Sequence, residues 1–156
     1  RKTFEGDDAT TEKYFEIAPG ARYVFIAETE ATADGGFRFA NGELTLSMIR
    51  QTPIVAQIVF LSADAPPDIL VKRAEAFLNA GARSVLVNTW KLPYQTEQLM
   101  LDALLGSLRR DDPLPEALSK SRTNYLQDLS KRSRTTGDVF VNNPSIWGSY
   151  HLFGRP

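Results

Sequence analysis

Cysteine is absent from the 156 residues of the chain, and His151 is its one histidine. Without cysteine, the chain itself has no disulfide, no thiolate metal site and no cysteine nucleophile. A lone histidine likewise excludes a metal site built from several imidazoles. No apolar run approaches the length of a membrane span or of a signal-peptide core. We therefore expect a cytoplasmic protein with no membrane partner and no cofactor.

An excess of charge of either sign is also missing. The 18 basic and 19 acidic residues give a net charge of -1, which offers no electrostatic reason to expect a nucleic acid or a membrane surface as partner. The basic cluster Lys131-Arg132-Ser133-Arg134 is short enough to be the solvated end of a helix. The length suits one domain that buries roughly 70% of its unfolded surface, so we expect residues 1–156 to form a single domain.

Apolar runs without polar alternation predict strands that are buried on both faces, as in the middle of a parallel sheet. These runs are Tyr23–Ala27, Val55–Leu61 and Ser84–Asn88, and a last strand is expected over Ile146–Phe153. Helical patterns cover Thr10–Ala18, Leu44–Arg50, a segment from Pro66-Pro67-Asp68 to Gly81, Thr96–Leu108, and a segment from Asp112 to Leu129. Turn residues predict a hairpin around Phe37–Phe39, and the polar segment Ser130–Asn143 predicts a loop.

This order of elements predicts an α/β fold with a mostly parallel sheet flanked by helices. Right-handed crossovers place the connecting helices on one face of a sheet that grows in one direction, yet the strands are apolar on both faces. The helix over Thr10–Ala18 is expected to cover part of the other face. The chain begins with Arg1 rather than Met, as a piece of a longer protein would. We expect an upstream segment or a second chain to complete the sheet at the edge strand Tyr23–Ala27.

Small and polar residues follow each apolar run, at the strand ends where open α/β sheets place their ligands. Ser62 and Asp64 follow the second run, and Trp90 follows the third. Three polar residues follow the first run. The sequence therefore predicts a binding cleft lined by Glu28, Thr29, Glu30, Ser62, Asp64 and Trp90.

The carboxylates of this cleft leave two other uses open. Glu28, Glu30 and Asp64 could offer oxygen ligands to Mg²⁺ or Ca²⁺, and Asp64 with either glutamate could do the acid and base work of an unusual hydrolase. Carboxylates at strand ends are more often simply solvated, so we expect no metal. His151 lies within an apolar strand pattern and is expected to pack or to lie on the surface rather than act as a base. The spacing of Met48 predicts a core position.

Four stretches of the chain, in this order, resemble the CHAT domain, a caspase-like peptidase family that is often attached to TPR repeats. They are Gly6–Thr10 with Ala21–Ala27, then Asn41–Ile49, then Phe60–Asp64, and finally Ala76–Trp90 with Asn143–Gly154. The resemblance covers essentially the whole chain but begins after the first two strands of the family. It implies a caspase-like sheet whose first strands are missing, which agrees with the uncovered face inferred above.

In this family, a histidine at the end of one strand and a cysteine at the end of the next form the dyad that cleaves peptide bonds. The resemblance places these two positions on Thr29 and Asp64. Threonine is no base near neutral pH, and a carboxylate is a poor nucleophile toward amides because its acyl product is an anhydride. Glu30 stands where the family has a glycine, and the acidic residue expected after the family tryptophan is missing from Trp90–Tyr94.

The resemblance therefore implies a catalytically inactive pseudo-peptidase with a binding, scaffolding or regulatory role toward a protein or peptide partner. Two alternatives stay open, an atypical hydrolase and a fragment of an active cysteine peptidase that carries inactivating changes. The second alternative is weakened because both dyad positions, Thr29 and Asp64, depart from the family.

Overall fold

The computed structural model describes residues 4–26, 30–62, 65–90, 94–136 and 149–155. The chain divides into two compact units, residues 1–91 with 150–155 and residues 92–149 with 156. None of the described helices combines the length and the apolar character that crossing a membrane requires.

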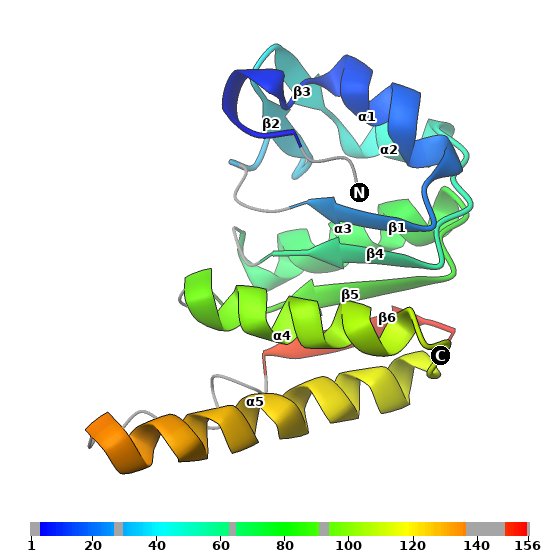
Figure 1. Ribbon diagram of the computed structural model, residues 1–156. Helices are drawn as coiled ribbons and strands as arrows, with labels where there is room; N and C mark the ends of the chain where they lie inside the picture. Colours follow the sequence, from blue (N-terminus) through cyan, green and yellow to red (C-terminus); the bar gives the residue numbers. More distant parts are fainter. Residues whose placement is uncertain (1–3, 27–29, 63–64, 91–93, 137–148, 156) are drawn as a thin grey trace. The chain divides into compact units, whose positions relative to one another are not determined.

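The first unit is built on a four-stranded sheet in the order β1-β4-β5-β6 (Figure 1). Strands β1 (Tyr23–Ile26), β4 (Ile58–Leu61) and β5 (Ser84–Asn88) are parallel, and β6 (Tyr150–Gly154) runs antiparallel to β5. Helices pack against this sheet. The prediction of an α/β fold with a mostly parallel sheet flanked by helices is therefore confirmed.

Strand β4 is shorter than the apolar run that predicted it. The run begins at Val55, whose side chain is 72% exposed, whereas the strand begins at Ile58. Before the strand, the N–H of Ile54 donates to the carbonyl oxygen of Ala80 at 2.9 Å. That backbone is therefore engaged outside the sheet, which hydrophobicity along the sequence does not reveal.

The other predicted strands agree with the sheet where the structure describes them. The run Ser84–Asn88 coincides with β5, and the run Tyr23–Ala27 agrees with β1. Its last residue, Ala27, lies outside the described residues. The strand predicted over Ile146–Phe153 overlaps β6, and its residues before Ser149 also lie outside the described part of the chain.

Threonine caps start the first two helices. The hydroxyl of Thr10 accepts a backbone N–H in the first turn of α1 (Thr11–Ile17), and the hydroxyl of Thr45 does the same for α2 (Leu46–Gln51). Such a cap satisfies a backbone donor that the helix itself leaves unpaired. Both helices were predicted, with α2 starting slightly later than expected. Met48 on α2 is exposed, so its predicted core position is wrong.

Helix α3 (Pro67–Asn79) shows the expected signals at both ends. Proline occupies its first turn, where the missing N–H has no intrahelical acceptor to lose. After the helix, Gly81 has a φ of +111°, a conformation that favours glycine. Two short 3-10 helices, η1 (Gly6–Asp8) and η2 (Ala18–Gly20), complete the helical elements of this unit.

A hairpin of β2 (Phe37–Phe39) and β3 (Gly42–Leu44) connects β1 to α2 and confirms the predicted turns. Arg38 and Glu43 lie opposite each other in the hairpin and form an ion pair at 3.0 Å. Such an exposed pair contributes little free energy, about 1 kcal/mol at most. The hairpin is held instead by its buried side, where Phe37 and Leu44 join the core.

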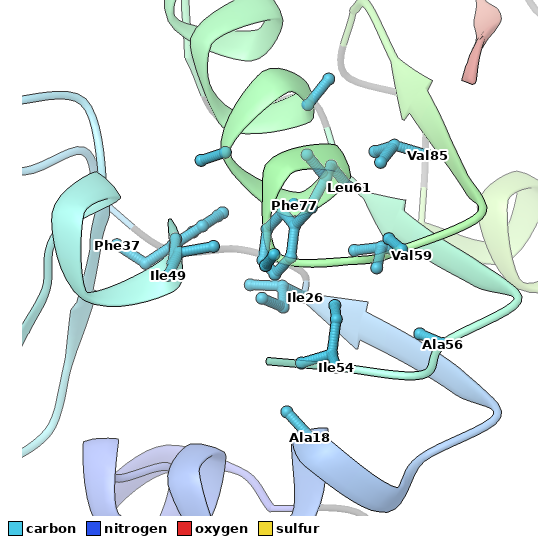
Figure 2. Close-up of a cluster of buried hydrophobic side chains, with 14 of the residues drawn as sticks. Ala18, Ile26, Phe37, Ile49, Ile54, Ala56, Val59, Leu61, Phe77 and Val85 are labelled. Atoms are coloured by element: carbon cyan, nitrogen blue, oxygen red, sulfur yellow. The ribbon is translucent and has the colours of Figure 1, made fainter. Parts of the chain in front are cut away.

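The core of the first unit lies between one face of the sheet and the helices (Figure 2). Side chains that alternate along the strands point to this face, among them Val59, Leu61 and Val85. Phe77 of α3 packs into the same cluster. Ala18 belongs to this cluster as well, so the prediction that the helix over Thr10–Ala18 covers the other face is wrong.

The opposite face of the sheet carries a row of aromatic side chains. The ring of Phe60 lies 5.7 Å from that of Phe25 and 5.6 Å from that of Tyr150, measured between centroids. Phe25 is 42% exposed although its neighbour Phe60 is buried. Phe25 belongs to β1, the last strand of the sheet on that side.

The second unit contains two helices that pack against each other, α4 (Tyr94–Leu108) and α5 (Leu114–Thr136). Asp111, with a φ of +60°, lies in the short reversal between them. The predicted helices are confirmed, but α5 continues to Thr136 through the first part of the loop predicted over Ser130–Asn143. That stretch is polar yet contains neither proline nor glycine before Gly137, so nothing in it ends a helix. The remainder of the predicted loop lies outside the described residues.

We predict that Gly36→Ala will destabilise the protein. A Cβ at this position would lie 2.2 Å from the carbonyl oxygen of Leu44 and 2.9 Å from the hydroxyl oxygen of Thr32. Because a backbone atom blocks the space, relief requires the hairpin to move, at a cost of about 1–3 kcal/mol or more. Thermal unfolding should show a melting temperature lower by about 2–4 °C for each kcal/mol lost.

Gly20→Ala is the matched control, since a Cβ there meets no atom within 4 Å. Its melting temperature should stay close to that of the wild type. If both variants melt like the wild type, the close packing at Gly36 is not rigid.

Candidate functional site

The carboxyl ends of β1 and β4 meet at one edge of the sheet. Ile26 and Leu61, the last residues of the two strands, are paired in the parallel register. Directly beyond them, the N–H of Ser62 donates to the carbonyl oxygen of Ile26 at 3.1 Å. The pairing of Leu61 with Val87 brings the end of β5 to the same edge. This edge is where open α/β sheets bind ligands.

Three of the six residues predicted to line the cleft are described. Ser62 is buried beside the end of β1, and Trp90 follows the end of β5 with 40% of its surface exposed. Glu30 is exposed at the start of the loop that leads from β1 to the hairpin. The other three, Glu28, Thr29 and Asp64, lie outside the described residues.

Arg38 is a neighbour of Glu30 that the sequence pattern did not predict. The N–H of Arg38 donates to the carbonyl oxygen of Glu30 at 3.0 Å, and its guanidinium lies 3.8 Å from the Glu30 carboxylate. The same guanidinium also pairs with Glu43. Because two carboxylates share one exposed cation, the charge of Glu30 is only partly balanced. An Arg within a short hairpin strand, eight residues beyond Glu30, gave no sequence signal for this pairing.

Asp34 holds the loop between β1 and the hairpin closed. One of its carboxylate oxygens accepts the hydroxyl of Thr32 at 2.5 Å and the N–H of Gly36 at 3.1 Å. The other accepts the N–H of Leu46 at 2.8 Å, at the start of α2. Asp34-Gly35-Gly36 was predicted only as a turn. The side chain of Asp34 also joins that turn to α2.

The pKa of Asp34 is below its ordinary value. Burial by itself would raise the pKa, but hydrogen bonds from Thr32, Gly36 and Leu46 to the charged form together outweigh it. The carboxylate is therefore ionised at neutral pH and stabilises the loop in that form.

The one histidine of the chain lies on the edge strand opposite β1. His151 is exposed on β6, paired with Val87 of β5, while β1 forms the opposite edge of the sheet. The expectation that it lies on the surface of an edge strand is confirmed. Among the described residues, no group of three or more His, Cys, Asp or Glu side chains could hold a metal ion. Two of the three carboxylates that could have offered oxygen ligands, Glu28 and Asp64, lie outside those residues.

The CHAT domain family model matches residues 2–155 of the chain, which is essentially its full length. A search of curated proteins gave no match. The matched region includes β1, β4 and β5 with their shared carboxyl edge, and the mixed α/β architecture is consistent with a caspase-like fold.

We predict that Asp34→Asn will lower the free energy of unfolding at pH 7 by about 0.5–1 kcal/mol, the lower part of the range for a lost helix cap. An asparagine can offer one acceptor oxygen, but its NH₂ group would face a backbone N–H. A lowered native pKa means that the stabilisation is complete above the ordinary value of 3.8 and is lost as the pH falls through the native value. Urea titrations from pH 7 into strongly acidic solution should therefore show the variant and the wild type converging.

Asp7→Asn provides the control, since Asp7 is exposed in η1 and changing it leaves the Asp34 contacts intact. Its stability should follow the wild type at every pH. A gap between wild type and Asp34→Asn that stays constant with pH would mean that ionisation of Asp34 does not matter.

Proposed function

The chain belongs to the CHAT domain family of caspase-like peptidases, and from this we propose that it is an inactive member that keeps the fold to bind a partner. The peptidase chemistry of the family needs a thiolate nucleophile and an imidazole base. The family motif puts these groups at positions 64 and 29, which are Asp64 and Thr29 in this chain.

The absence of cysteine from the sequence is the observation that carries this proposal. A carboxylate at position 64 attacks an amide poorly, because the anhydride it would form is more reactive than the amide it came from. Thr29 has no group that takes up a proton near pH 7. His151, the remaining imidazole, lies on β6, which β5 separates from β4, the strand before position 64; this speaks against its serving as a substitute base.

A binding role is supported by what is kept at the carboxyl edge. The ends of β1, β4 and β5 still converge there, and Trp90 presents a partly exposed indole of the kind enriched at interfaces. We propose a protein or peptide partner for the cleft that the sequence predicts from Glu28, Thr29, Glu30, Ser62, Asp64 and Trp90. The net charge of -1 gives no support for a nucleic acid in that place.

The wider setting belongs to the same proposal. The domain would act in the cytoplasm within a larger protein or complex, and TPR repeats are its expected neighbours because the family is often attached to them. The exposed Phe25 on β1 supports a further strand on that edge. This strand would come from an upstream segment or from a second chain.

We predict that the wild-type protein will not cleave a fluorogenic peptide library above the uncatalysed rate. The double variant Thr29→His with Asp64→Cys should also fail to restore robust cleavage. Glu30 remains where the family has a glycine, and the acid expected after Trp90 is still missing. Circular dichroism should confirm that the variant is folded, and reaction of the new thiol with iodoacetamide should confirm that it is accessible.

Asp64→Asn is the comparison for the wild type. Cleavage by the wild type that disappears in Asp64→Asn would establish the hydrolase alternative and reject the proposal. Measurable cleavage by the double variant would show instead that substrate recognition survives in the scaffold and that only the two dyad side chains have been lost.

We predict that the chain self-associates through β1 when no other strand is supplied, and that Phe25→Lys weakens this association. A charged side chain on an edge strand opposes pairing with another chain. Phe15→Lys is the matched control, since Phe15 is a similarly exposed phenylalanine on α1. Sedimentation velocity over a range of concentrations should show larger species for the wild type and for Phe15→Lys, and a shift to monomer for Phe25→Lys. A wild type that stays monomeric throughout would reject pairing at this edge.

A further inference from the structure

Arg73 is an arginine in the middle of the core-facing side of α3, and only 1% of it is exposed. Transfer of a guanidinium from water to a protein interior costs several kcal/mol unless its charge and its N–H groups find partners there. Arginine is therefore rarely buried to this extent. The contacts that Arg73 makes must offset this cost.

The guanidinium of Arg73 binds three consecutive residues of the loop that follows β1. Its Nε donates to the carbonyl oxygen of Gly35 at 2.8 Å, and its Nη2 donates to that of Gly36 at 2.7 Å. Its central carbon lies 4.1 Å from the ring centroid of Phe37. These are charge-assisted hydrogen bonds and a cation–π contact, all inside the core, where screening by water is weak.

This loop is also held by hydrogen bonds between its own residues. The N–H of Arg38 donates to the carbonyl oxygen of Glu30, and Ala31 forms an antiparallel bridge with Phe37. The N–H of Gly35 donates to the carbonyl oxygen of Thr32 at 2.9 Å. A contact that fixes Gly35 and Gly36 therefore also fixes Glu30, at the other end of the loop.

The loop and α3 each follow a different strand of the sheet. The helix begins at Pro67, a short way after Ser62 at the end of β4, while the loop it binds begins at Glu30, a short way after Ile26 at the end of β1. Arg73 thus joins the segment that follows β1 to the helix that follows β4.

We infer that Arg73 is a positioning residue, which holds the loop Glu30–Phe37 against α3 and so keeps the two segments at the carboxyl edge of the sheet in fixed relation. This role of Arg73 concerns the position of the loop and does not depend on what the cleft binds or cleaves. A planar guanidinium can bond two carbonyl oxygens and stack on a ring at once. A lysine ammonium in its place is a point charge without that geometry.

Hydrogen exchange of the folded protein, followed by NMR, tests this role. In Arg73→Met, the amide hydrogens of Gly35, Gly36 and Arg38 should exchange about tenfold faster or more, as expected from the loss of hydrogen bonds to a charged group. The amides of β4 and β5 should exchange at wild-type rates. In Arg73→Lys, the exchange rates of the loop amides should lie between those of the wild type and of Arg73→Met. Lysine keeps the charge but loses the paired N–H donors of the guanidinium and its stacking on Phe37.

Lys72→Met is the matched control, because Lys72 is the exposed neighbour of Arg73 on the same helix. It should leave exchange in the loop unchanged. Equal acceleration of the loop and of β4 and β5 in Arg73→Met would overturn the inference, since Arg73 would then stabilise the core as a whole. Unchanged loop exchange would also overturn it. If Arg73→Met does not fold, Arg73→Lys decides by the same comparison, and failure of both to fold assigns Arg73 to global stability and rejects the positioning role.

Discussion

The parallel pairing of β1 with β4 is the constraint on which the candidate site depends. Its register ends with Ile26 opposite Leu61, and the N–H of Ser62 then donates to the carbonyl oxygen of Ile26. A slip of one residue would turn every side chain of β1 to the other face of the sheet. Ile26 would then leave the core, and Phe25 would take its place there. The apolar side chains buried between the sheet and the helices on one face, and the row of aromatic rings on the other face, both oppose such a slip. The register therefore determines which residues are adjacent where the two loops leave the sheet.

Beyond the strand ends, buried polar contacts fix the chain more firmly than exposed ion pairs do. Arg38 lies between Glu30 and Glu43 at the surface, where water screens each attraction. Arg73 makes hydrogen bonds in the core, and its removal would take one buried donor away from each of the Gly35 and Gly36 carbonyl oxygens. The loop after β1 therefore owes its position mainly to Arg73 and to the Asp34 carboxylate. The same contacts allow Glu30 to be exposed without loosening the loop.

Sequence reasoning recovered what local chemistry decides and missed what depends on tertiary partners. The strand Ser84–Asn88 follows from residue type and run length and is confirmed, and so are the helix that follows Pro66 and its end before Gly81. Exposed Val55 shows the limit, since hydrophobicity alone does not tell a strand from the apolar segment that leads into it.

The burial of Arg73 is the feature that the sequence prediction missed most clearly. A charged residue is expected at the surface, and only the loop carbonyls, some 37 residues earlier, explain its burial. For the site, the sequence located the ends of the strands, whereas the roles of Arg38 and Asp34 depend on contacts that no local pattern contains.

A fold of this kind does not need its catalytic side chains in order to stand. The contacts that set the β1–β4 register are backbone hydrogen bonds and buried apolar side chains, and those that hold the loop come from Arg73 and Asp34. Neither the β1–β4 pairing nor the loop contacts of Arg73 and Asp34 use a histidine as a partner. In the proposed inactive member, Thr29 and Asp64 would therefore stand at the dyad positions without removing any of these contacts. Catalytic groups are often kept in arrangements that a fold tolerates rather than favours. A domain that has given up cleavage is free of that conflict, and its carboxyl edge can be shaped by binding alone.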